Sequence, residues 1–135
     1  MLMEYDIKTH KREELIDITE YILQSLRKSN IKEGIVVVFT PHTTAALTIN
    51  ENADPSVKED ILEFLNRKIP KECNIFTHLE GNSDAHIKSS LFGTSLNLIV
   101  SNGQLILGTW QGIYFCEFDG PRSRRFYVKI IRDNL

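Results

Sequence analysis

The chain has 135 residues, of which 41% are hydrophobic and 25% charged, and its formal net charge at pH 7 is −2. This length and composition indicate a single globular domain, residues 1–135, and argue against disorder. The small net charge gives no reason to expect nucleic acid or an anionic membrane surface as a partner. The longest apolar run, 35–39, is far too short to span a bilayer.

Two features bear on the cellular compartment. Residues 1–6 lack the basic region and apolar core that begin a secretory signal. Cys73 and Cys116 are far apart and have no paired-ligand spacing, so reduced thiols are expected rather than a disulfide. We therefore expect a cytoplasmic protein.

The first half of the chain predicts strands and two amphipathic helices. After a strand over 2–9, Thr9 is the expected cap of a helix in which apolar residues recur at helical spacing to about residue 28. Strands are then expected over 35–39 and 47–50. Asp54-Pro55, an acidic cap followed by proline, predicts the start of a second helix that ends before Pro70.

The second half predicts almost only strands. A polar loop carries residues 78–86, and alternating apolar residues follow on both sides of a hairpin turn at Asn102-Gly103. Two further strands are expected over 113–118 and 126–131. The fold class predicted is α+β, with β-sandwich-like antiparallel sheets and two flanking helices.

Three histidines stand in polar runs that interrupt this apolar pattern. His42 follows a buried strand, and His78 and His86 border the second polar loop. A catalytic zinc site typically has three protein ligands and one open position, so convergence of these rings would create a metal site. The alternative is that each histidine is a loop or surface residue hydrogen-bonded to the backbone.

Carboxylates near these histidines are candidates for acid–base chemistry. Asp84 precedes His86 by two residues and would lie on its side of an extended segment, where it could orient the imidazole or act as a base. Glu51 is a second candidate, and Glu80 a third. The alternative is that Asp84 and Asn82 close turns with their side chains.

Hydroxyl groups and one cation suit a phosphate ligand. Thr43, Thr44, Ser89 and Ser90 supply hydroxyls, and Lys88 supplies the charge. Threonine is also a good strand former, so the first two have a structural alternative. No glycine-rich phosphate loop occurs, which disfavours a nucleoside triphosphatase.

The only tryptophan of the chain, Trp110, is followed by Gln111 and bracketed by glycines. An indole can stack on a flat heteroaromatic ring, and glycine permits close approach of the backbone. A core tryptophan at a strand bend is the alternative.

Three runs together resemble one protein family. They are 41–52 (PHTTAALTINEN), 81–86 (GNSDAH) with Lys88, and the block from 107–111 (LGTWQ) to 118–122 (FDGPR). These runs are similar to those of the YjbQ family, also called uncharacterised protein family 0047 or the secondary thiamine-phosphate synthase family.

The resemblance implies a homotrimer of β-sandwich-like subunits with sites near subunit boundaries. It implies a metal centre at His42, His78 and His86, for which zinc is the expected ion. The implied activity joins a hydroxymethylpyrimidine diphosphate to a thiazole phosphate and releases pyrophosphate. Asp84 and Glu51 are the expected catalytic carboxylates. The residues expected to bind the phosphorylated small molecule are Thr43, Thr44, Asn82, Lys88, Ser89, Trp110 and Gln111.

Two other functions compete with this one. A metal-dependent hydrolase would use the three histidines to hold an ion that activates water, with Asp84 or Glu51 taking the proton. A trimer that binds a metal or a small molecule without catalysis is the other alternative.

Overall fold

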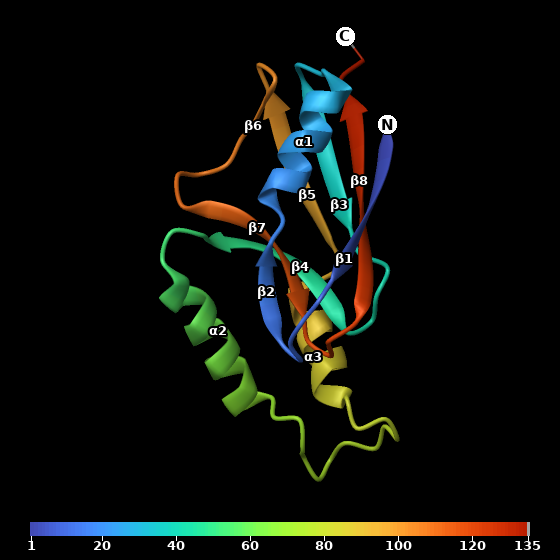
Figure 1. The fold of residues 1–135 in the computed structure, drawn as a ribbon, viewed down its shortest axis with the longest axis vertical. Helices are drawn as coiled ribbons and strands as arrows, with labels where there is room; N and C mark the ends of the chain where they lie inside the picture. Colours follow the sequence, from blue (N-terminus) through green and yellow to red (C-terminus); the bar gives the residue numbers. More distant parts are fainter. Residues whose placement is uncertain (135) are drawn as a thin grey trace.

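The computed structural model describes residues 1–134, in which the strands form two antiparallel sheets (Figure 1). The larger sheet has the order β1 (Leu2–Lys8), β8 (Ser123–Arg132), β3 (Gly34–Phe39), β5 (Ser95–Ser101), β6 (Gln104–Leu105). The smaller sheet has the order β2 (Glu14–Asp17), β7 (Gln111–Glu117), β4 (Ala45–Glu51). The predicted α+β class with antiparallel sheets is confirmed.

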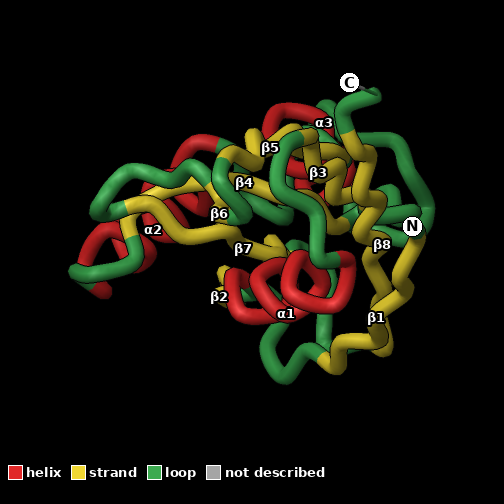
Figure 2. The backbone as a smooth tube through the Cα atoms, turned by 90° about the horizontal axis from the view of Figure 1, so that it is seen from above, coloured by secondary structure: helices red, strands yellow, loops and turns green. Residues whose placement is uncertain are grey.

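The described residues form three helices, α1 (Thr19–Ser29), α2 (Pro55–Lys68) and α3 (Ser83–Phe92). Figure 2 shows α2 and β1 at opposite ends of the molecule, with α1 along one side of the sheets. The expectation of two helices missed α3, because its apolar residues do not gather on one face. No helix in the described part of the chain has the length and apolar character needed to cross a membrane.

The first helix was predicted to begin nine residues too early, because its cap is Ile18 rather than Thr9. Residues 14–17 form strand β2 and pair with β7, so the helix starts only at Thr19. Asp17 accepts hydrogen bonds from the N–H and the hydroxyl of Thr19, at 2.9 and 2.6 Å. Thr9, the predicted cap, instead donates its hydroxyl to Glu117. Because a four-residue strand is followed almost at once by the helix, the apolar residues of both continue at helical spacing. The pattern therefore predicts a single longer helix.

The start of α2 is as predicted. Asp54 precedes the helix and its side chain accepts the N–H of Ser56 at 2.9 Å, and Pro55 occupies the first helical position. Proline is suited to that position because its missing N–H would have no partner inside the helix. The helix ends at Lys68, before Pro70.

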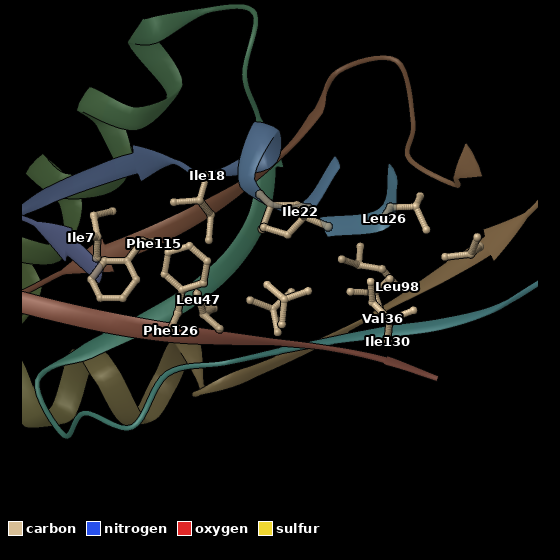
Figure 3. Close-up of a cluster of buried hydrophobic side chains, with 14 of the residues drawn as sticks. Ile7, Ile18, Ile22, Leu26, Val36, Leu47, Leu98, Phe115, Phe126 and Ile130 are labelled. Atoms are coloured by element: carbon tan, nitrogen blue, oxygen red, sulfur yellow. The ribbon is translucent and has the colours of Figure 1, made fainter. Parts of the chain in front are cut away.

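The main hydrophobic core fills the space between the two sheets and α1 (Figure 3). Phe115 of β7 and Phe126 of β8 face each other there from the two sheets, and both are fully buried. Alternate residues of β7 point to opposite faces, so Tyr114 and Cys116 join a second apolar cluster beneath α2 and α3. The smaller sheet is therefore covered on both faces, which explains why β7 is apolar almost throughout.

The outer face of the larger sheet stays uncovered within one chain. Val36 and Val38 point into the core, so their neighbours in β3 point outward. This outer face carries exposed apolar side chains: Ile35, Phe39, Ile99 and Ile131. A row of this kind is the type of surface that subunit contacts cover.

Candidate two-histidine site

His78 and His86 are brought together at the beginning of α3. His78 lies in the loop that connects α2 to α3, and His86 lies in the first turns of α3. The centroids of the two imidazole rings are 5.3 Å apart, and the ring planes are nearly perpendicular, at 89°. His78 is exposed and His86 is half-buried. Both rings are therefore within reach of a ligand from solvent.

The separation of the two rings suits a shared metal ion. A tetrahedral zinc ion with Zn–N bonds of about 2 Å places the centroids of two coordinating imidazoles about 5 Å apart. The observed 5.3 Å agrees with that value. Glu80 lies beside the pair, with its Oε1 3.9 Å from Nε2 of His78. Two imidazole rings and one carboxylate therefore lie close together at this site.

His42 is occupied elsewhere in the same chain. Its Nε2 accepts the backbone N–H of Arg125, in β8, at 3.0 Å. Burial, and then the charge of the Arg124 guanidinium, lower the pKa of His42 and favour the neutral ring that this hydrogen bond requires. Within residues 1–134, no group of three His, Cys, Asp or Glu side chains is placed to hold a metal. One chain therefore brings together two of the three histidines predicted as ligands. His42 is instead hydrogen-bonded to the backbone, which is the alternative that the sequence left open.

Two cavities border His78. The larger, about 630 Å³, is lined mainly by polar side chains, among them Lys71, Glu72 and Glu80. The smaller, about 380 Å³, is lined by Ile75, Phe76 and Ile87 together with both histidines. Both volumes are in the range of small-molecule sites. His78 therefore borders a polar and an apolar cavity, and His86 borders the apolar one.

Asp84 does not face this site. It lies two residues before His86 in a helix rather than in an extended segment, so the two side chains point to different sides. Its carboxylate is fully buried and accepts two hydrogen bonds from Arg12, each 3.1 Å long, and one from Lys88 at 3.2 Å. Burial alone would raise the pKa of Asp84, but these hydrogen bonds outweigh burial and lower it. The proposed role of Asp84 as a base toward a metal-bound water has no support in this geometry.

The predicted phosphate-binding groups serve the interior instead. Lys88 is fully buried, and its Nζ donates to Glu13 and Asn66, each at 2.9 Å, as well as to Asp84. Ser89 donates its hydroxyl to the backbone oxygen of Ala45. The other three predicted hydroxyl groups have different surroundings. The Thr44 hydroxyl accepts a hydrogen bond from buried Arg124, and Ser90 donates one to the backbone oxygen of His86. Thr43 is exposed.

Glu51, Trp110 and Gln111 lie at the opposite end of the smaller sheet. Glu51, the last residue of β4, pairs with Gln111, the first of β7, whereas α3 contacts β4 at Ala45. Trp110 is 62% exposed, so the core-tryptophan alternative is wrong. Gln111 accepts the N–H of Gly108, and Glu51 accepts the N–H of Ala53. Within one chain these residues do not join the histidine pair.

Asn82 connects the histidine region to the turn between β7 and β8. It is buried directly before α3, and its Nδ2 donates to Asp119 at 2.8 Å and to Glu80 at 3.4 Å. Its Oδ1 has no hydrogen-bond partner. Asn82 therefore helps to fix the start of α3 through its amide group.

The partners of the buried charges could not be predicted from the sequence. Arg124 lies in a basic run that resembles a solvated hairpin tip, but it is buried in a two-bonded ion pair with Glu117. Thr9 donates to the same carboxylate at 2.7 Å. Arg12 and Glu13, near the other buried cluster, look like ordinary surface charges in sequence. Only their partners, which are distant in the sequence, show that these residues belong to a cluster of buried charges.

This arrangement defines a class: an α+β protein of two antiparallel sheets with a paired-histidine site beside an interhelical loop. The chain belongs to the YjbQ family, since the family model described as "UPF0047 protein YjbQ-like" matches residues 3–133. It is 65% identical to a UPF0047 protein of Methanocaldococcus jannaschii, over 98% of this chain and 96% of the relative. It is 53% identical to the UPF0047 protein YugU of Bacillus subtilis, over 97% and 99%.

Solved structures give the same result. A YjbQ/UPF0047 family protein of Clostridium acetobutylicum superimposes with a TM-score of 0.93 at 54% identity, over 96% of this chain and 99% of the other. A YbjQ-like protein of unknown function from Sulfolobus solfataricus gives a TM-score of 0.94 at 33% identity, over 98% and 97%. The fold is therefore that of the family.

Proposed function

We propose that the protein is a metal-binding enzyme with thiamine-phosphate synthase activity, which joins a hydroxymethylpyrimidine diphosphate to a thiazole phosphate. The observation that carries this proposal is the histidine pair, with its ring centroids 5.3 Å apart, in which His78 borders both a polar and an apolar cavity. A reaction of two different substrates needs two adjoining binding sites. His78 lines both cavities, and His86 lines the apolar one.

The metal, for which zinc is the expected ion, would be held by His78 and His86. The separation of the rings supports this assignment. The third ligand would come from a neighbouring subunit. His42 of another copy could serve only through its Nδ1, because its Nε2 accepts the N–H of Arg125. When bound, the ion would supply positive charge for the departing pyrophosphate.

A homotrimer would bring such a ligand close. The exposed apolar row on the outer face of the larger sheet supports association of subunits, because Ile35, Phe39 and Ile99 would be removed from water there. A site completed by a second copy accounts for the incomplete ligand set of one chain.

The cavity residues suit the two parts of the substrates differently. Ile75, Phe76 and Ile87 in the smaller cavity would cover the face of a flat pyrimidine ring. Lys71 in the larger cavity would bind phosphate oxygens. The sequence predicted this role for Lys88, but Lys88 is buried. The reaction itself breaks the bond between the pyrimidine methylene and the diphosphate oxygen and forms a bond to the thiazole nitrogen.

The test is an assay of purified protein with the two precursors, combined with elemental analysis. His78→Ala and His86→Ala are each expected to abolish product formation and bound metal. His10→Ala is the matched control, because His10 is distant in sequence from the site and exposed. Product formation that survives the loss of both His78 and His86 would exclude this site.

A metal-dependent hydrolase is the second candidate, and the position of Glu80 favours it. Glu80 lies 3.9 Å from His78, and its side chain is mostly exposed, so it could take a proton from a water molecule in the larger cavity. A panel of phosphate esters and amides separates the two candidates. Hydrolysis that depends on Glu80, without thiamine phosphate as a product, would support the hydrolase.

A further inference from the structure

The polarity of α3 is inverted. Its buried residues are Asp84, Ala85, Lys88 and Ser89. Ile87 and Leu91, by contrast, are 38% and 67% exposed. Burial of apolar surface would by itself favour a rotation of α3 that turned Ile87 and Leu91 inward. Ala85 and Phe92 do pack against the second apolar cluster, but the larger part of the buried face is polar. Apolar burial alone therefore does not set the rotation of this helix about its axis.

A buried network of charges holds the helix in its observed rotation. Lys88 donates to Glu13 at 2.9 Å and to Asp84 at 3.2 Å, and Asp84 accepts two hydrogen bonds from Arg12 at 3.1 Å. Two positive charges thus face two negative charges. Lys88 also donates to Asn66 of α2 at 2.9 Å. The helix is consequently tied to the segment before β2 and to α2.

The geometry of an α-helix connects this network to the histidines. A shift by one residue rotates the helical positions by about 100°. Such a rotation would move Asp84 and Lys88 away from Arg12 and Glu13, and it would also turn His86 away from His78. Buried ionic groups contribute little net stability compared with apolar residues of similar size, but they can fix one register among several.

We propose that Asp84 and Lys88 are positioning residues that lock the rotation of α3, so that His86 and Ile87 face the loop that carries His78. Calling the positioned groups a functional site rests on the proposed function. The lock itself rests only on the contacts of the buried network and on the inverted polarity of the helix. It assigns Asp84 and Lys88 a role that needs no contact with substrate.

The test replaces the two members of the network on α3 by apolar side chains of similar size, in the double variant Asp84→Leu with Lys88→Met. Arg12 and Glu13 remain as a pair of opposite charges 3.6 Å apart. The readout is the nuclear Overhauser cross-peak between the ring protons of His78 and His86, assigned with the two single His→Ala variants. Because apolar groups replace paired charges, we expect the circular dichroism spectrum of the folded protein to be kept and the cross-peak to be lost.

The matched control makes the same two substitutions on α2, as Glu63→Leu with Arg67→Met. This ion pair also has i,i+4 spacing, with a distance of 2.8 Å, but both side chains are exposed. We expect its cross-peak between His78 and His86 to equal that of the wild type. Loss of the cross-peak in this control would mean that the readout follows general destabilisation, and would overturn the proposal.

A folded double variant that keeps the full cross-peak would also overturn the proposal. If the double variant does not fold, Asp84→Asn provides the measurement, because it keeps the shape of the side chain and removes its charge. A weakened cross-peak in this single variant supports the lock, and an unchanged one contradicts it. The readout uses neither metal nor substrate, so an inactive protein would bear on the proposed function alone.

Discussion

The space between the two sheets and the space beneath α2 and α3 are filled in different ways. Between the sheets, side chains from β3, β7, β8 and α1 are almost all apolar and fully buried. Beneath α2 and α3, a small apolar cluster adjoins the buried charges of Asp84 and Lys88, and α2 itself has no fully buried residue. The first region is held by non-directional burial, and the second depends on specific partners.

This difference matters because the histidine pair belongs to the second region. An apolar core tolerates small rotations of its elements at modest cost, whereas paired charges fix a single arrangement. The site is thus placed by the region whose contacts are directional.

Removal of a large core side chain is expected to have the largest effect. Phe115→Ala empties a fully buried position between the sheets and should lower the free energy of unfolding by about 4 kcal/mol. Chemical denaturation measures the change. Phe64→Ala, at a 61% exposed position of α2, is the control and should change it little. Similar losses in both variants would contradict the assignment of the core.

Removal of one member of the charge network comes next. Lys88→Ala leaves Asp84 and Glu13 buried without their cation, and about 3 kcal/mol of unfolding free energy should be lost. The exposed pair offers the comparison, because Arg67→Ala should cost less than about 1 kcal/mol. A Lys88 variant as stable as the Arg67 variant would show that the network is solvated.

Local stability should differ between α2 and the larger sheet. The apolar face of α2 is only half-buried, through Ile61, Leu62 and Leu65, so this helix should open without global unfolding. Hydrogen exchange should therefore be faster for the amides of α2 than for those of β3 and β8. Equal protection in α2 and the two strands would contradict the comparison.

The smallest expected effect is a difference in chemical reactivity between the two thiols, which involves no change in stability. Burial raises the pKa of the Cys116 thiol in β7, so little thiolate forms there. Cys73 lies half-buried in the loop before α3. Iodoacetamide at pH 8 should modify Cys73 in the folded protein and leave Cys116 unmodified until denaturant is added, as mass spectrometry of peptides can establish. Early modification of Cys116 would indicate that the smaller sheet opens.

Local chemistry explains which features were predictable. The Asp54-Pro55 start of α2 and the hairpin at Asn102-Gly103 depend on neighbouring residues, and both form as expected. The predicted start of the first helix was wrong because β2 owes its existence to pairing with β7, about 100 residues away. The helix α3 was missed because its buried face is polar, so periodicity could not identify it.

The amino-acid sequence by itself determined the α+β class, the alternation of the main strands and the family, because each depends on patterns within short segments. Only the tertiary structure decided which polar residues meet: His78 with His86, Lys88 with Glu13 and Asp84, and His42 with the backbone of Arg125. The physical reason is that hydrogen bonds and ion pairs act over a few ångströms in space, whatever the separation of their partners along the chain.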